Sequence, residues 1–324
     1  MPLVSVCIPT YNSAKYLGEA IESVLAQTFS RYELVICDNA STDGTEELCR
    51  KYSDARIRYV RFDTLVPQIP NWNRCLDLAT SEYVVLLHAD DILEPEFLAS
   101  AVAIMNENPD VGLVHCSVRH IDEAGSPLQL QRLYETDRVD REWDLLKRLL
   151  LTGCKVNPAG VMVRRSIYTS LGKFTDEIVW GSDWHMWIRI ALNGPVAYLA
   201  RPLARYRQHP QSGTSEVMAT ARNGEDELWV VKDAFNRIGE GSAELRSLRT
   251  AAIRGVSHRT WCFAERMCQM GFGRAARAGI RRAVAISPRM IADPKVAALW
   301  MATWVGYKRF AQLQAEATRL SRGR

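Results

Sequence analysis

Three short apolar segments near the start of the chain each end abruptly in polar residues. They read LVSVCIPTYN, YELVICDNASTDGT and YVVLLHADD, and segments with apolar residues at helical spacing lie between them. Strands that alternate with helices predict an α/β fold in which helices cover both faces of a mostly parallel sheet. Such sheets bind ligands at the carboxyl ends of their strands. We therefore expect one site where residues 9–12, 38–43 and 88–91 meet.

The pattern changes in the second half of the chain. Residues 141–153 and 182–192 have helical spacing, whereas 158–168 and 195–209 each contain a strand-like run. From about Glu216 onward the whole pattern is helical. We expect two regions, an α/β domain over residues 1–215 and a helical region over residues 216–324.

These two regions also differ in charge. The net charge is +4, but residues 251–324 hold 14 Lys/Arg against 3 Asp/Glu, and the other residues hold 27 against 34. An acidic body with a basic tail indicates separate tasks for the two. No nucleic-acid-binding motif accompanies the positive charge, so nucleic acid is not an expected partner.

Cysteine usage and the N-terminus point to the cytoplasm. The eight cysteines form no CxxC pair and have no regular spacing, which is typical of a reducing compartment. The N-terminus lacks the pattern of a signal peptide, and no stretch approaches the roughly 18–20 apolar residues that span a bilayer.

Two adjacent carboxylates follow the third apolar segment. Asp90 and Asp91 repel each other and cost free energy to bury, so either they hold a cation or Asp91 caps a helix that starts nearby. Mg²⁺ and Mn²⁺ prefer oxygen ligands and need few of them from the protein when phosphates and waters complete the shell.

Seven motifs in order resemble family 2 glycosyltransferases. They are VSVCIPTYN, LVICDNASTDGT, EYVVLLHADD, GVMVRRS, LGKFTDE, SDWHMWIR and YRQH, within residues 3–215. The resemblance implies the GT-A fold, with a Rossmann-like sheet flanked by helices and a C-terminal helical extension. It also implies an inverting hexosyltransferase that uses Mn²⁺ or Mg²⁺ to move a sugar from a nucleotide-sugar donor to an acceptor hydroxyl.

The resemblance also assigns residues to the donor site. Asp91 would bind the metal and Asp90 the donor ribose, although many relatives have Asp at the position of His88. Asp38 would accept a hydrogen bond from the ring N–H of uracil or thymine, which favours a UDP- or dTDP-sugar; the alternative is an Asp that caps the loop after the strand. The further nucleotide-sugar contacts expected are Pro9, Thr10, Tyr11, Asn12 and Asn73.

Asp183 is the expected catalytic base. A carboxylate must take the proton of the acceptor hydroxyl as that oxygen attacks the anomeric carbon. The family pattern there is Glu-Asp, and this chain has Ser182 in place of Glu, to which we assign no catalytic role. The alternative for Asp183 is stabilisation of a helix N-terminus. Trp184 and Trp187 follow it in the sequence and would either offer ring faces to a sugar or pack in the core.

The YRQH segment would close over the donor. Arg207 is expected to bind the nucleotide-sugar and His209 the metal, because positive charge near the diphosphate stabilises the leaving group. The alternative is a surface arginine and a loop histidine.

The basic tail leaves two possibilities open. It is either a helical subdomain with solvated arginines or a peripheral contact to the inner face of a membrane, where Trp300 and Trp304 suit an interfacial helix. A membrane contact would fit a lipid-linked acceptor in polysaccharide or glycolipid assembly; a glycan acceptor is the other expectation.

These motifs also bear on other possible functions. A non-catalytic nucleotide-sugar or glycan-binding module is the main alternative, although Asp91 and Asp183 are both present. A nucleotidyltransferase would need a glycine-rich phosphate loop near the first strand, and a dehydrogenase would need a GxGxxG motif there. The segment IPTYNSAKYLG contains neither, which disfavours both functions. The sequence does not indicate which sugar, nucleotide, acceptor or linkage is used, or the oligomeric state.

Overall fold

The computed structural model describes residues 1–212, 223–239 and 241–313, which form two compact units. The first unit comprises residues 1–149, 154–178 and 182–209. The second comprises residues 150–153 and 179–181 and the chain from Pro210 onward. The expected boundary at residues 215 and 216 lies outside the described residues.

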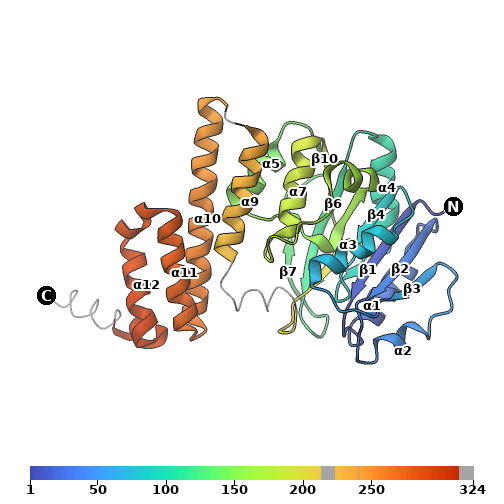
Figure 1. Ribbon diagram of the computed structural model, residues 1–324, viewed down its shortest axis with the longest axis horizontal. Helices are drawn as coiled ribbons and strands as arrows, with labels where there is room; N and C mark the ends of the chain where they lie inside the picture. Colours follow the sequence, from blue (N-terminus) through green and yellow to red (C-terminus); the bar gives the residue numbers. More distant parts are fainter. Residues whose placement is uncertain (213–222, 240, 314–324) are drawn as a thin grey trace. The chain divides into compact units, whose positions relative to one another are not determined.

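A ten-stranded sheet forms the centre of the first unit, counted over the described residues (Figure 1). The strand order is β3-β2-β1-β4-β9-β6-β10-β5, with β7 beside β6 and β8 beside β10. The strands are β1 (Val4–Thr10), β2 (Tyr32–Asp38), β3 (Ile57–Arg61), β4 (Tyr83–Leu86), β5 (Ile92–Leu93), β6 (Leu113–Ile121), β7 (Pro127–Gln131), β8 (Arg138–Asp140), β9 (Val161–Arg164) and β10 (Val196–Arg207).

The strands β3, β2, β1 and β4 run parallel to one another. The near-continuous apolar sequences of β1, β2 and β4 follow from this position, because strands in the middle of a covered sheet are buried on both faces, whereas the edge strand β3 is only partly buried. The sheet as a whole is mixed: β9 lies antiparallel between β4 and β6, and β6 is again parallel to β10. The α/β prediction is confirmed.

Helices cover both faces of the sheet. They are α1 (Leu17–Leu25), α2 (Thr45–Cys49), α3 (Gln68–Leu78), α4 (Phe97–Glu107), α5 (Asp144–Thr152), η1 (Pro158–Gly160), α6 (Arg165–Leu171) and α7 (Ser182–Asn193). Helices α1 and α4 bury their apolar faces in the main core with Val4, Val6 and Ile8 of β1. Cys7 points to the opposite face, toward the carbonyl of Cys75 in α3. This alternation is the period of two expected of a strand.

Helix α1 starts later than the apolar spacing predicts. The pattern suggests a start near Ser13, whereas the helix begins at Leu17. The backbone N–H groups of Ser13 and Ala14 donate to the side chains of Thr45 and Asp43. These bonds hold the segment against the loop after β2.

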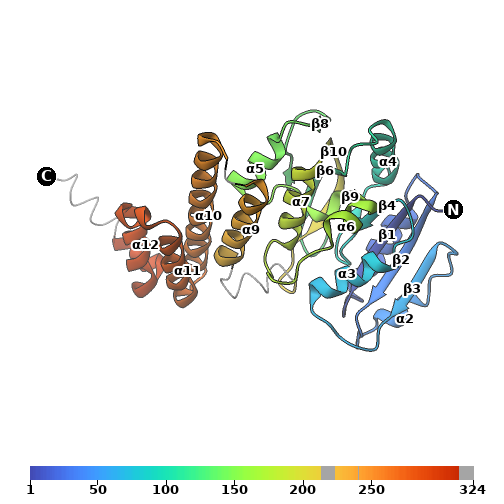
Figure 2. The same cartoon turned by 45° about the horizontal axis from the view of Figure 1, so that its top comes forward.

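The second unit contains α9 (Asn223–Ile238), α10 (Ala243–Gln269), α11 (Gly273–Ile286), η2 (Pro288–Ala292) and α12 (Pro294–Val305) (Figure 2). Helices α10, α11 and α12 share a core of their own that includes Met267, Ile280 and Leu299. The helical prediction is confirmed for the described part of residues 216–324. None of the helices in the described residues is both long and apolar enough to cross a membrane.

Candidate active site

The three polar strand ends meet at one edge of the sheet. Thr10 at the end of β1 pairs in register with Asp38 at the end of β2. On the other side of β1, Cys7 pairs with Leu86 of β4, so residues 88–91 follow at the same edge. The predicted convergence of the strand ends is confirmed by these registers.

His88, Asp90 and Asp91 form a cluster suited to a divalent cation. One ligand atom from each lies within 4.8 Å of the others. Asp91 is fully buried, and its Oδ1 accepts a hydrogen bond from the backbone N–H of Arg207 at 3.0 Å. Its Oδ2 lies 3.7 Å from Nδ1 of His88. Within the described residues, Oδ2 of Asp91 and Nε2 of His88 have no hydrogen-bond partner.

The electrostatics of this cluster suit the binding of a cation. Burial and the neighbouring Asp90 raise the pKa of Asp91 well above its ordinary value. Burial lowers the pKa of His88, which leaves a neutral imidazole able to act as a ligand. A divalent cation would satisfy the buried carboxylate and offset its repulsion from Asp90.

The capping alternative for Asp91 does not hold. Residues 92–93 form β5, and the next helix, α4, starts at Phe97 with Glu96 at the N-cap position. Asp91 is therefore too far from the helix start to cap it.

Arg207 and His209 both contact residues 88–91, which we call the acidic loop. Nε2 of His209 lies 3.0 Å from Oδ2 of Asp90, and its ring lies 4.8 Å from that of Tyr16. Arg207 is 1% exposed, so the surface-arginine alternative is wrong. Its guanidinium donates to the carbonyls of Asp90 and Glu123 and to the Glu19 carboxylate. All three of its side-chain nitrogens therefore bond to protein groups.

The expected base-binding residues line the ends of β1 and β2. Asp38 is fully buried; its Oδ1 accepts from the Ser41 N–H at 2.9 Å and its Oδ2 from the Tyr59 hydroxyl at 2.5 Å. The hydroxyl of Thr10 is buried without a partner among the described residues. Pro9 is buried beside it, and Tyr11 is 45% exposed.

Two asparagines join separate segments of this edge. Asn12 has a φ of 48°, in the left-handed region, and its Oδ1 accepts from the N–H of Thr42. Asn73 bonds to both backbone groups of Phe174, at 2.9 and 3.1 Å. The amide of Asn73 is thereby engaged in holding α3 to the segment before α7.

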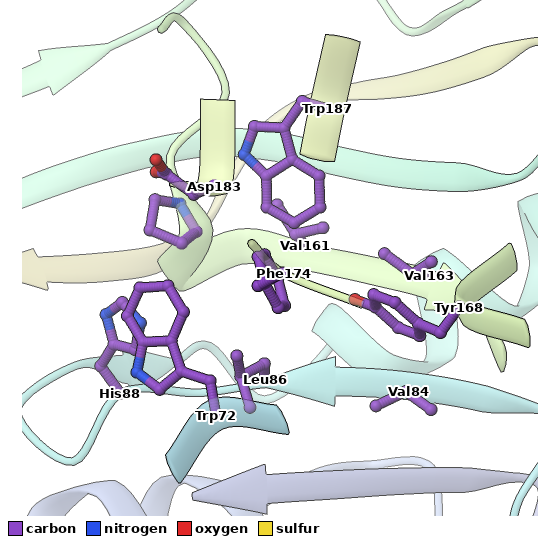
Figure 3. A pocket seen from close by; sticks show the side chains of 11 residues that line it. Trp72, Val84, Leu86, His88, Val161, Val163, Tyr168, Phe174, Asp183 and Trp187 are labelled. Atoms are coloured by element: carbon purple, nitrogen blue, oxygen red, sulfur yellow. The ribbon is translucent and has the colours of Figure 1, made fainter. Parts of the chain in front are cut away.

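Asp183 lies in the first turn of α7 and faces the same space as His88. Figure 3 shows both side chains at one end of a pocket whose walls include Trp72, Phe174 and Trp187. Trp72 stacks on His88 with ring centroids 4.9 Å apart. The apolar surroundings raise the pKa of the partly buried Asp183, while the hydrogen bond from the N–H of Trp184 opposes that shift. The exposed thiol of Cys154 lies 3.9 Å from Oδ2 of Asp183.

The two tryptophans of α7 are core residues. Trp184 is 1% exposed and Trp187 is 3% exposed, so neither offers an open ring face. Ser182 is also buried, and its hydroxyl donates to the carbonyl of Thr175. These contacts fix the first turn of α7, from which Asp183 projects.

His88 lies in the predicted site without a predicted ligand role, and Trp72 was not predicted to lie there. His88 was noted only as a departure from a carboxylate, although an imidazole beside two aspartates is itself a possible ligand set. Trp72 carried no signal of its own, because its position over His88 depends on how α3 packs against β4.

Comparison with known proteins identifies similar chains and folds. The model of the family Glycosyl transferase family 2 matches residues 5–169. An uncharacterized glycosyltransferase of Nostoc sp. is 30% identical over 254 residues, which cover 74% of this chain and 77% of that protein.

Two solved structures share the fold. The 1–349 chain of S. aureus TarS in complex with UDP-GlcNAc has a TM-score of 0.58 and 18% identity, and the match covers 93% of this chain and 91% of that one. A mannosyltransferase from Pyrobaculum calidifontis in complex with GDP-Man and Mn²⁺ has a TM-score of 0.59 and 20% identity, covering 98% and 86%. The expected fold class is confirmed by these likenesses.

Proposed function

The chain belongs to glycosyltransferase family 2, and from that premise we propose that it transfers a hexosyl group from a nucleoside-diphosphate sugar to an acceptor hydroxyl with inversion. The observation that carries the proposal is a pocket lined by both Asp183 and His88, the latter a member of the His88–Asp90–Asp91 cluster. A nucleotide-sugar whose diphosphate is bound through a metal at this cluster would present its sugar to the Asp183 carboxylate. A UDP- or dTDP-sugar is the favoured donor.

The donor side of the site would be formed by the three strand ends. Asp91, with His88 and Asp90, would hold Mn²⁺ or Mg²⁺. When bound, such a cation offsets the charge that develops on the departing diphosphate. Asp90 would also bind the ribose. Asp38 would reach the base through a lone pair not used by Ser41 or Tyr59, beside Pro9, Thr10 and Tyr11.

The acceptor side would centre on Asp183. Its carboxylate would take the proton of the acceptor hydroxyl while that oxygen forms the new bond to the anomeric carbon and the diphosphate departs from the opposite face. The raised pKa of Asp183 suits this task, because a more basic carboxylate accepts the proton more readily.

Several expected donor contacts have protein partners that suggest an indirect role. We propose that Arg207 positions the acidic loop through its bonds to the Asp90 carbonyl and the Asp91 carboxylate. His209 would orient Asp90, and direct binding of a metal through Nε2 would require that contact to break. Asn12 and Asn73 would shape the donor site by fixing the loop after β2 and the segment before α7.

The acceptor is proposed to be a glycan or a lipid-linked saccharide in polysaccharide or glycolipid assembly, at the inner face of a membrane. The nucleotide-sugars in the two similar structures, UDP-GlcNAc and GDP-Man, support the donor class. The Mn²⁺ of the mannosyltransferase supports a metal requirement.

The test is calorimetric titration of UDP, dTDP and GDP, each with Mn²⁺ and with EDTA. We expect metal-dependent binding of one nucleotide, lost in Asp91→Ala. The matched control is Asp110→Ala, which removes an exposed carboxylate near the amino end of β6, at the opposite edge of the sheet. That variant should bind as the unmodified chain does.

Two outcomes would count against the proposal. If no nucleotide binds in the presence of metal, a degenerate binding module becomes the better account. If a nucleotide binds equally well with EDTA, that result contradicts binding of the diphosphate through a metal at this cluster.

A further inference from the structure

Large apolar side chains are exposed at one end of the helices α10, α11 and α12. Met270 and Phe272 lie in the turn between α10 and α11 and are 59% and 55% exposed. Met301, Trp304 and Val305, on one face of the second half of α12, are 53%, 67% and 46% exposed. Isolated exposed apolar residues are common, but a contiguous patch marks an interaction surface.

The turn and the end of α12 lie side by side, so these five residues form one surface. A Cβ on Gly273 would lie only 2.7 Å from the carbonyl oxygen of Thr303. Arg277 donates to that same carbonyl at 2.8 Å, and its guanidinium lies 4.1 Å from the centroid of the Trp304 ring. We call the surface of Met270, Phe272, Met301, Trp304 and Val305 the bundle tip.

Cations surround the bundle tip. The exposed ones are Arg266, Arg274, Lys308 and Arg309, and Arg277 stacks on Trp304. Between residues 266 and 313 the one carboxylate is Asp293, which caps the other end of α12. Because α12 has 12 residues and rises about 1.5 Å per residue, this carboxylate lies roughly 18 Å along the helix from the tip.

We propose that the bundle tip is a docking surface for a bilayer that contains anionic lipid. Tryptophan and phenylalanine favour the headgroup level of a membrane, and arginine and lysine bind lipid phosphates. Nucleic acid explains the cations but not the exposed Met270, Met301 and Val305. A protein partner would account for the apolar residues but gives no reason for a rim of one charge.

This inference deepens the proposed function, since it names the surface that would bring the enzyme to a lipid-linked acceptor. Only the link to a lipid-linked acceptor rests on the proposed function; the membrane contact itself is argued from the bundle tip. Vesicle binding is measured without donor or acceptor, so its failure would leave the nucleotide titration unaffected.

The test is co-sedimentation of the full chain with vesicles of phosphatidylcholine alone and with about one-third phosphatidylglycerol. We expect binding to the anionic vesicles at least tenfold tighter than to the neutral ones. Lys308→Glu with Arg309→Glu should weaken it by about thirtyfold, since each basic residue lost costs roughly fivefold. Phe272→Ser with Trp304→Ser should also weaken it at least tenfold.

Two controls match these variants. Ile291→Ser removes a side chain that is 74% exposed on η2, beyond the far end of α11. Arg246→Glu reverses an exposed charge in the first turn of α10, about 35 Å along that 27-residue helix from the tip. Both should bind vesicles as the unmodified chain does, and circular dichroism should show that all variants remain folded.

Brominated lipids test whether Trp304 itself reaches the bilayer. They should quench tryptophan emission of the unmodified chain, and Trp304→Phe should lose most of that quenching while retaining vesicle binding. The proposal is overturned if neither vesicle type binds, if the tip variants bind normally, or if the controls lose binding equally. It is also overturned if the tip variants merely convert an oligomer to a monomer.

Discussion

Asp183 is the residue on which the proposed transfer step depends. Asp183→Asn keeps the size of the side chain but removes the proton acceptor, so we expect kcat to fall by about 10²–10⁴. The Kd for nucleotide with Mn²⁺ should stay within about twofold, because Asp183 is not in the metal cluster. Steady-state kinetics and calorimetry measure the two quantities. A parallel loss of nucleotide affinity would contradict the assignment of Asp183 as base.

The raised pKa of Asp183 predicts a pH dependence of both rate and stability. The rate should rise with pH through a midpoint above 3.8, because the base must be ionised. A carboxyl whose folded pKa is raised stabilises the fold below its unfolded pKa, and this contribution is lost as pH rises through the folded pKa. At neutral pH Asp183→Asn should therefore raise the free energy of unfolding, by about 1 kcal/mol or less because the group is partly solvated. A rate midpoint at or below 3.8 would contradict the shift.

Asp91 predicts how the protein responds to metal removal. Mn²⁺ at about 100 times its Kd should stabilise the fold by about 2.7 kcal/mol, and EDTA should reverse this. Asp91→Asn can still accept from the Arg207 N–H but removes the charge that Asp90 repels. We expect its Tm without metal to be higher than that of the unmodified chain and to change little on adding Mn²⁺. Thermal melts with Mn²⁺ and EDTA test this; an equal metal response in both proteins would exclude Asp91 as a ligand.

At the scale of elements, β10 links the acidic loop to two other segments through Arg207. Arg207→Met would leave the Asp90 and Glu123 carbonyls without their donor and Glu19 without its partner. We expect a loss of about 3 kcal/mol in the free energy of unfolding and weaker Mn²⁺ binding. Urea denaturation and calorimetry measure these effects.

The control for Arg207 lies on the same strand. Arg205 pairs with Glu94 at 2.7 Å but its side chain is 41% exposed, so Arg205→Met should cost about 1 kcal/mol or less. Equal losses in the free energy of unfolding for both variants would mean that the strand β10, and not the buried guanidinium of Arg207, holds the acidic loop in place.

The elements also show what the sequence alone can and cannot predict. Apolar runs ending in polar residues indicated β1, β2 and β4 and placed Asp90 and Asp91 at the correct edge, because strand periodicity is a local property. The insertion of antiparallel β9 beside β4 depends on contacts between residues about 80 positions apart, which periodicity does not record.

Individual side chains of the site were harder to predict than the strands. Arg207 was expected at the donor diphosphate, whereas its three nitrogens bond to carbonyls and a carboxylate of other segments. Trp184 and Trp187 had two open roles, and only packing showed that both are buried. A side chain's partners come from distant parts of the chain, so its residue type alone does not fix its role.

At the scale of the whole molecule, the two units have separate apolar cores. One core lies around the sheet and the other between α10, α11 and α12. We expect scanning calorimetry to show two unfolding transitions, because separate cores break two-state behaviour. Mn²⁺ with the bound nucleotide should raise only the transition of the first unit, and Asp91→Ala should abolish that rise. A single transition that shifts as a whole would contradict the prediction.

The exposed thiol beside Asp183 offers a route to chemical control of the enzyme. Six of the eight cysteines are buried, and Cys154 and Cys262 are the exposed ones. With Cys262 replaced by serine, a thiol-reactive fluorophore or a tethered acceptor fragment would attach at Cys154, whose sulfur lies 3.9 Å from the Asp183 carboxylate. Such a conjugate would report acceptor entry directly, and a reversible disulfide tether would allow the reaction to be stopped and restarted with a reducing agent.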